Sequence, residues 1–142
     1  MNPTQQACNY ALLRFLPYPE TGEFVNVGVL VSCQQPCSLW FVAERTMPER
    51  AKALFPKQNV QVFEASLEAL RQEMERVKSG ARDPKSVQHA FNESVRIRES
   101  VFRFGEVRTI LTANPQTLAE ELFSRYVRME IPAMHGVQSA SA

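Results

Sequence analysis

The sequence predicts an α+β domain: an antiparallel β-meander of three to four strands, with three to four helices packed mainly on one face of the sheet. Two observations predict it. Residues 1–43 contain three short segments of alternating or clustered apolar side chains, separated by turns rich in proline. After residue 45 the apolar spacing lengthens to three and four residues, which is typical of amphipathic helices. Connections as short as the two N-terminal turns favour antiparallel pairing.

The three N-terminal strands are expected at residues 9–16, 23–32 and 38–43, joined by the turns PYPETG and QQPC. If the first two strands pair across PYPETG, the numbers of facing residues add up to about 40. One side of this hairpin is then wholly apolar, and a slip of one residue would expose its valines. The pairs expected on that side are Ala11 with Val29, Leu13 with Val27, and Phe15 with Val25.

The helices are predicted from apolar stripes and from capping patterns. Thr46 and Glu49 have the spacing of a capping box, and Asp83 and Asn114 each precede a proline suited to a first helical turn. The expected helices span residues 46–54, 60–78, 84–93 and 115–127, and a fourth strand is expected at residues 94–104. The residues expected in the core are Phe15, Val25, Val27, Val29, Trp40, Phe63, Leu67, Leu70, Leu118 and Leu122.

Length and composition set the limits for domain organisation and location. The chain has 142 residues, which suits one domain, and we expect residues 1–131 to form it and residues 132–142 to be a flexible tail. The net charge of +1 provides no general attraction to nucleic acid or to an anionic membrane. No apolar run approaches the ~18 residues of a membrane span, and the first residues do not resemble a signal peptide. We therefore expect a cytoplasmic protein with no membrane contact.

The three cysteines predict neither a disulfide framework nor a metal site. Their odd number, without an export signal, suits a reducing compartment, and Cys8 and Cys33 are expected to be small buried apolar residues. Cys33 and Cys37 are spaced more widely than the usual ligand pair of a structural zinc site, and only two histidines could complete such a set. We expect no metal and no cofactor.

The second side of the predicted hairpin is mixed, and it carries the candidate site. Arg14 is expected opposite Asn26, Gly28 opposite Leu12, and Glu23 at the beginning of the second strand. In one interpretation this is structural: Asn26 bonds the backbone or Arg14, and Gly28 forms a bulge or admits another segment. In the other, Arg14, Glu23 and Asn26 form a polar cluster that binds a carboxylate, a phosphate or a partner's backbone, and Gly28 leaves room for it.

The stretch YALLRFLPYPETGEFVNVGVLV, residues 10–31, resembles the N-terminal signature of a bacterial family of unknown function, DUF3037. The pattern is a strand that ends in Arg14 and Phe15, a proline-containing turn, and then G-E-F-x-N-V-G-V. The family has no assigned activity. The resemblance implies a small protein encoded beside HipA-like kinases, with an accessory or antitoxin-like role.

No catalytic signature is present: the five glycines form no phosphate-binding loop, and neither G-x-S-x-G nor H-E-x-x-H occurs. We therefore predict a non-enzymatic protein-interaction or accessory module, with a HipA-like kinase as the candidate partner and with no predicted catalytic residue. One alternative is a small-ligand or phosphoryl enzyme centred on Arg14, Glu23 and Asn26. Another is a nucleic-acid-binding protein, although glutamates interspersed among its arginines argue against it. The arginines of that alternative are Arg96, Arg98, Arg103, Arg108, Arg125 and Arg128.

Overall fold

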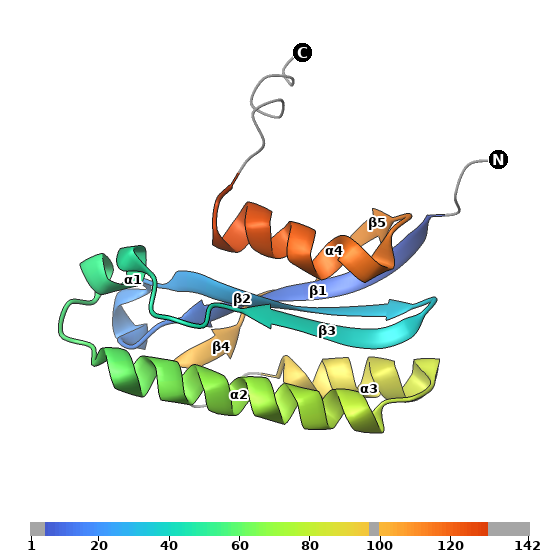
Figure 1. The fold of residues 1–142 in the computed structure, drawn as a ribbon, viewed down its shortest axis with the longest axis horizontal. Coiled ribbons are helices and arrows are strands. Elements are labelled where there is room, and N and C mark those ends of the chain that lie inside the picture. Colours follow the sequence, from blue (N-terminus) through green and yellow to red (C-terminus); the bar gives the residue numbers. More distant parts are fainter. Residues whose placement is uncertain (1–4, 97–99, 131–142) are drawn as a thin grey trace, which may run out of the picture.

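The computed structural model describes residues 5–96 and 100–130, and within them a five-stranded antiparallel sheet lies between two layers of helix (Figure 1). The α+β class predicted from the sequence is confirmed. Three long strands form the predicted meander: β1 (Gln6–Phe15), β2 (Val25–Gln34) and β3 (Cys37–Ala43). A single 3₁₀ turn, η1 (Pro19–Thr21), lies between β1 and β2, and Gly22 ends it at φ 76°, a conformation that favours glycine.

Two short strands complete the sheet on the far side of β1. β4 (Phe102–Phe104) pairs with the end of β1 at Leu13–Phe15, and β5 (Arg108–Thr112) pairs with its beginning at Gln6–Tyr10. The prediction of one strand over residues 94–104 is wrong in extent, since Ser94 still belongs to a helix and, among the described residues of this range, only Phe102–Phe104 form a strand; residues 97–99 lie outside the described part. β5 was not predicted, because five residues with one alternation carry little periodic signal.

The helices begin close to the predicted residues, and their caps show why. In α2 (Val60–Gly80), Asn59 Oδ1 accepts a hydrogen bond from the Val62 N–H at 2.9 Å, and in α3 (Pro84–Ser94), Asp83 and Ser86 form a reciprocal capping box. The first helix, α1 (Glu49–Leu54), begins after Pro48 without a side-chain cap, so the capping box predicted from Thr46 is wrong. α4 (Pro115–Leu122) continues into a π-helical turn, η2 (Phe123–Val127).

A β-bulge between β1 and β2 changes the predicted register. Arg14 pairs with Asn26 and Phe15 with Val25, as predicted, but Leu13 pairs with Gly28 because Val27 is the extra residue. Beyond the bulge each residue of β2 is therefore shifted by one relative to the predicted register. The predicted pairs Leu13 with Val27 and Ala11 with Val29 are wrong, and Val29 and Val31 lie on the face opposite to Val25.

Helices pack on both faces of the sheet, and every valine of β2 is buried in spite of the bulge. On one face α2 and α3 pack on Ala11, Leu13 and Phe15, and on the other α4 and η2 pack on Tyr10, Val29 and Val31. The two longest helices, α2 and α3, thus share one face, and α4 lies on the opposite face (Figure 1). Eight of the ten residues predicted for the core are buried, while Trp40 and Leu70 are only partly buried.

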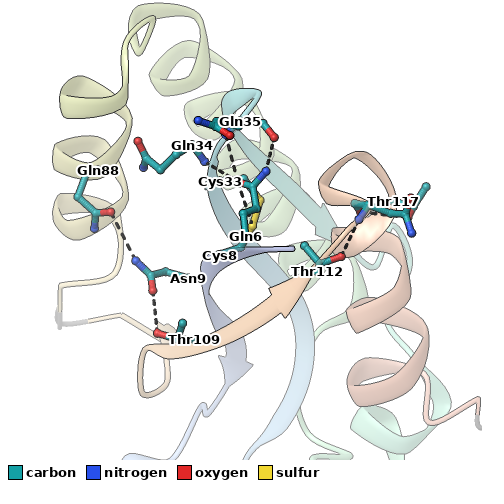
Figure 2. Close-up of a disulfide and its surroundings, with 11 residues drawn as sticks. Gln6, Cys8, Asn9, Cys33, Gln34, Gln35, Gln88, Thr109, Thr112 and Thr117 are labelled. Carbon is teal, nitrogen blue, oxygen red and sulfur yellow. Dashed lines mark hydrogen bonds between the residues drawn. A yellow bond between two sulfur atoms is a disulfide. The ribbon is translucent and has the colours of Figure 1, made fainter. Parts of the chain in front are cut away.

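Cys8 and Cys33 are joined by a disulfide, with their Cα atoms 4.7 Å apart, in the apolar cluster beneath α4 (Figure 2). Both are buried, as predicted, but the prediction that they stay unpaired is wrong. The odd count was misleading because it is Cys37, at the start of β3, that remains free. The pairing also removes the argument for a reducing compartment that rested on unpaired cysteines.

Candidate functional site

The candidate site lies on the face of the sheet that α4 covers, where the apolar cluster under α4 comes to an end. Tyr10 and Leu12 of β1 belong to or pack on that cluster, whereas Arg14, two residues further along the strand, does not. Asn26 lies directly opposite Arg14 on β2. The strand pairing thus places Arg14 and Asn26 opposite each other, as the sequence predicts, while their role as a binding site stays a prediction.

Among the described residues, the Arg14 side chain is held by packing contacts and not by hydrogen bonds. Its guanidinium carbon lies 4.3 Å from the centre of the Phe24 ring, a cation–π contact. Gly105 also lies against the guanidinium group, because a Cβ on this glycine would lie 2.7 Å from Arg14 Cζ. The Nε atom is buried and has no hydrogen-bond partner among the described residues. A buried donor without an acceptor is energetically costly.

Asn26 presents the complementary feature. Its backbone oxygen accepts a hydrogen bond from Arg50 Nη2 of α1 at 2.8 Å, which ties β2 to the helix. Its side-chain Oδ1 is buried and, within the described part of the chain, accepts no hydrogen bond. Two facing side chains therefore each carry an unsatisfied polar atom, Nε on one and Oδ1 on the other. We call Arg14, Asn26, Phe24 and Gly105 the Arg14 site.

The other two candidate residues lie apart from this site. Glu23 is exposed in the turn before β2, where its N–H donates to Thr21 Oγ1 at 3.1 Å, and among the described residues its carboxylate forms no ion pair with Arg14. Gly28 pairs with Leu13 and therefore belongs to the opposite face. A Cβ on Gly28 would lie 3.0 Å from both Ala43 Cβ and Val42 O, so its missing side chain admits β3 rather than a ligand.

The charge around the Arg14 site is positive. Arg103 of β4 lies directly across from Arg14, and its Nε donates to Ser100 O at 2.9 Å. The buried carboxylate of this region, Glu44, is shared by Arg50 at 3.6 Å and Arg128 at 3.2 Å. Among residues 5–96 and 100–130, neither Arg14 nor Arg103 has a carboxylate within ion-pair distance, so an acidic group would meet two uncompensated guanidinium groups.

The arginines of the nucleic-acid alternative take part in separate interactions. Arg96 pairs with Glu93 at 3.1 Å, Arg108 with Glu106 at 3.0 Å, and Arg128 with Glu44. Arg125 lies over the Tyr126 ring, and Arg98 lies outside the described residues. This alternative stays a prediction.

The sequence does not identify Phe24 and Gly105 as parts of the Arg14 site, nor Arg50 as the residue that holds the Asn26 backbone. Only Phe24 had a usable signal, because an exposed aromatic residue two positions before Asn26 on the same strand face can reach Arg14. Arg50 comes from α1 and Gly105 from the end of β4, and nothing local in their sequence indicates that they meet β1 and β2. In the described ranges no group of three or more His, Cys, Asp and Glu side chains could hold a metal ion.

Comparison with known protein families identifies the family of this chain. The model of the family described as "Protein of unknown function (DUF3037)" matches residues 10–127. The chain belongs to the DUF3037 family. All the residues of the Arg14 site lie within the matched range of this DUF3037 protein. Searches of curated proteins and of solved structures find no match to the chain. Among the residues that the structure describes, no helix has both the length and the apolar character needed to span a membrane.

Proposed function

We propose that this DUF3037 protein is a non-enzymatic accessory module that binds a partner protein through an acidic side chain, which docks on Arg14 and Asn26. The observation that carries the proposal is the pair of unsatisfied atoms: Arg14 Nε lacks an acceptor and Asn26 Oδ1 lacks a donor. A carboxylic acid side chain next to a backbone amide, which every acidic residue of a protein has, offers both. The carboxylate matches the fork of the guanidinium, and the amide N–H matches Asn26 Oδ1.

The setting supports a protein partner rather than a reaction. The site lies at the end of the α4 cluster, it is flanked by the exposed Phe24 ring, and it includes no histidine, cysteine or serine as a nucleophile or base. The resemblance described above implies the partner to test first, a HipA-like kinase of the kind that the resemblance places beside members of the family. This association also carries the proposal of a cytoplasmic location, because a kinase works where ATP is available.

The experiment measures binding of the purified chain to the neighbouring HipA-like kinase by biolayer interferometry, in wild type and in Asn26→Asp. The new carboxylate is nearly isosteric with the amide and lies opposite Arg14. It therefore forms an ion pair with the Arg14 guanidinium and competes with the carboxylate of the partner. We expect Asn26→Asp to fold normally and to bind at least about 10-fold more weakly, since the loss of one charge-assisted contact costs that much. Arg14→Lys keeps the charge but loses the fork, and we expect it to bind more weakly than wild type too.

Arg82→Gln is the matched control, because Arg82 is exposed between α2 and α3 and contacts only the Ser79 carbonyl oxygen through its side chain. This variant should bind like wild type. Equal binding by wild type, Asn26→Asp and Arg14→Lys would show that the Arg14 site is not the contact. If the kinase does not bind at all, the same variants are compared by co-purification from the native host, and the proposal is rejected when no protein is depleted by Asn26→Asp.

A further inference from the structure

A second site lies on the opposite face of the sheet, and it shares no residue with the Arg14 site. A cavity of about 610 Å³ lies between α3 and the strands β1 and β2, within the size range of small-molecule sites. Asn9 and Ser32, which pair across β1 and β2, form its floor together with Gln34. Gln88, His89 and Lys85 of α3 line the facing wall.

The side chains on the two walls are aligned by a chain of hydrogen bonds. Thr109 Oγ1 of β5 donates to Asn9 Oδ1 at 2.9 Å, and Asn9 Nδ2 donates to Gln88 Oε1 at 3.4 Å (Figure 2). Gln88 Nε2 in turn donates to Asn92 Oδ1 at 2.9 Å. Each amide is therefore fixed in orientation by its neighbours, and the chain links three elements, β5, β1 and α3. Such preorganisation is what a small-ligand site requires of its polar groups.

Ser32 carries the observation that points to a ligand. Its side chain lies on the α3 side of the sheet, because its cross-strand partner Asn9 reaches Gln88 there. The residue is 2% exposed and lines the cavity, and its hydroxyl is buried without a hydrogen-bond partner among the described residues. A serine is an unexpected choice for a buried position unless its hydroxyl has something to bind. A rotation about one side-chain bond is all that the hydroxyl needs to meet a ligand in the cavity.

The chemistry of the walls defines the ligand. The described residues around the cavity include Lys85 and His89 but no carboxylate, so the local charge favours an anion. Lys85 is the second residue of α3, and because the Asp83 carboxylate already caps this helix end, the lysine itself supplies the positive charge. No aromatic residue other than His89 and no large aliphatic residue lines the cavity, so the ligand has little apolar surface to bury.

We infer that this cavity binds a small hydrophilic anion, whose phosphate or carboxylate group lies at Lys85 and whose hydroxyl groups reach Ser32 and the amides of Asn9 and Gln34. A sugar phosphate or a sugar acid has this chemistry. The inference goes beyond the proposed function, since it concerns a different face, different residues and a small molecule rather than a protein.

The test uses glucose 6-phosphate, gluconate and glucose as probes, titrated into the full chain and followed by isothermal titration calorimetry and by amide chemical shifts. We expect saturable binding of at least one of the two anions, at least about 10-fold tighter than that of neutral glucose. Lys85→Gln should remove the difference in affinity between the anion and glucose. Ser32→Ala should weaken the binding of the anion. Amide shifts should concentrate in residues 84–92 and at Ser32. Lys57→Gln, at an exposed lysine outside the cavity, is the matched control and should bind like wild type.

The inference is overturned if neither anion saturates below about 10 mM, or if glucose binds as tightly as the anions. It is also overturned if Lys85→Gln or Ser32→Ala, with an unchanged thermal unfolding midpoint, binds like wild type. Phosphate alone binding as tightly as glucose 6-phosphate would assign the contact to an adventitious ion only, and would likewise reject a hydroxyl-bearing ligand.

Discussion

The two faces of the sheet differ in how completely their helices cover them, and the two proposed sites follow from that difference. The longer layer, α2 and α3, runs along one face and leaves a cavity where α3 lies over polar residues of β1 and β2. The shorter layer, α4 and η2, covers only the region around Tyr10, Val29 and the disulfide, and the Arg14 site begins where it stops. We propose that the cavity beneath α3 holds a small molecule and that the surface beyond the α4 cluster binds a protein.

The bulge at Val27 makes this division possible. Without it, Val25, Val27 and Val29 would share one face, and the other face would carry Asn26, Gly28 and Leu30 under α4. The bulge supplies Val29 and Val31 to the α4 cluster while Val25 and Val27 stay with α2. One extra residue thus lets a single strand serve two apolar cores and still present Asn26 beside Arg14.

The largest predicted effect on stability comes from a substitution in the core beneath α3. Phe91 of α3 is completely buried among Ala11, Leu30 and Val87, so Phe91→Ala leaves a cavity and should lower the free energy of unfolding by about 3–5 kcal/mol. Urea denaturation measures this value. Val62→Ala, at a valine that is 62% exposed, is the control and should cost less than about 0.5 kcal/mol. Similar losses for the two variants would mean that α3 does not seal this face.

A smaller effect tests which valine belongs to which face. Val27→Ala and Val29→Ala should each cost about 1–3 kcal/mol, because both side chains are fully buried. Double-mutant cycles then separate the clusters. Val27 should couple with Leu67 and Val29 with Leu122, each by at least about 0.5 kcal/mol, because each pair shares a cluster. The crossed pairs should be additive, and strong coupling between Val27 and Leu122 would refute the bulge.

Alkaline pH should weaken the partly covered face first. Burial, followed by the neighbouring Tyr126 phenol, raises the pKa of Tyr10 above its ordinary value of 10.0, and the two rings stack with their centres 6.4 Å apart. A raised pKa in the folded state means that the contribution to stability is complete below pH 10.0 and is lost as the pH rises from there through the folded pKa. Tyr10→Phe should therefore lose stability less steeply above pH 10.0 than wild type does, in urea unfolding at successive pH values.

The smallest effect concerns the cap of α3, at the edge of the fully covered face. Hydrogen bonds from Ser86 lower the pKa of Asp83 below its ordinary value of 3.8. The stabilisation by this carboxylate is therefore present above pH 3.8 and is lost as the pH falls through the folded pKa. Asp83→Asn, which cannot ionise, should unfold with a shallower pH dependence in acid than wild type, as followed by circular dichroism. Identical acid profiles for the two proteins would show that the capping box is not formed in solution.

How much the sequence could reveal depended on whether a feature is local. The meander, α2, α3 and the pairing of Arg14 with Asn26 were predictable, because alternation, the apolar stripe and the short PYPETG turn are all signals between near neighbours. The bulge was not, since it is decided by which helices cover each face, and strands buried on both faces lose their alternation. The contacts of Gly105 with Arg14 and of Arg50 with Asn26 could not be predicted for the same reason, because both residues come from elements whose contacts with β1 and β2 are long-range.

The most direct test of the two-face account measures the binding of Arg14→Lys and Lys85→Gln to both proposed ligands, the HipA-like kinase and the anion. We predict that Arg14→Lys weakens kinase binding at least about 10-fold and leaves anion binding unchanged. Lys85→Gln should weaken anion binding at least about 10-fold and leave kinase binding unchanged. If both variants weaken the same ligand, or if the kinase responds to Lys85 and not to Arg14, the assignment of one function to each face is contradicted.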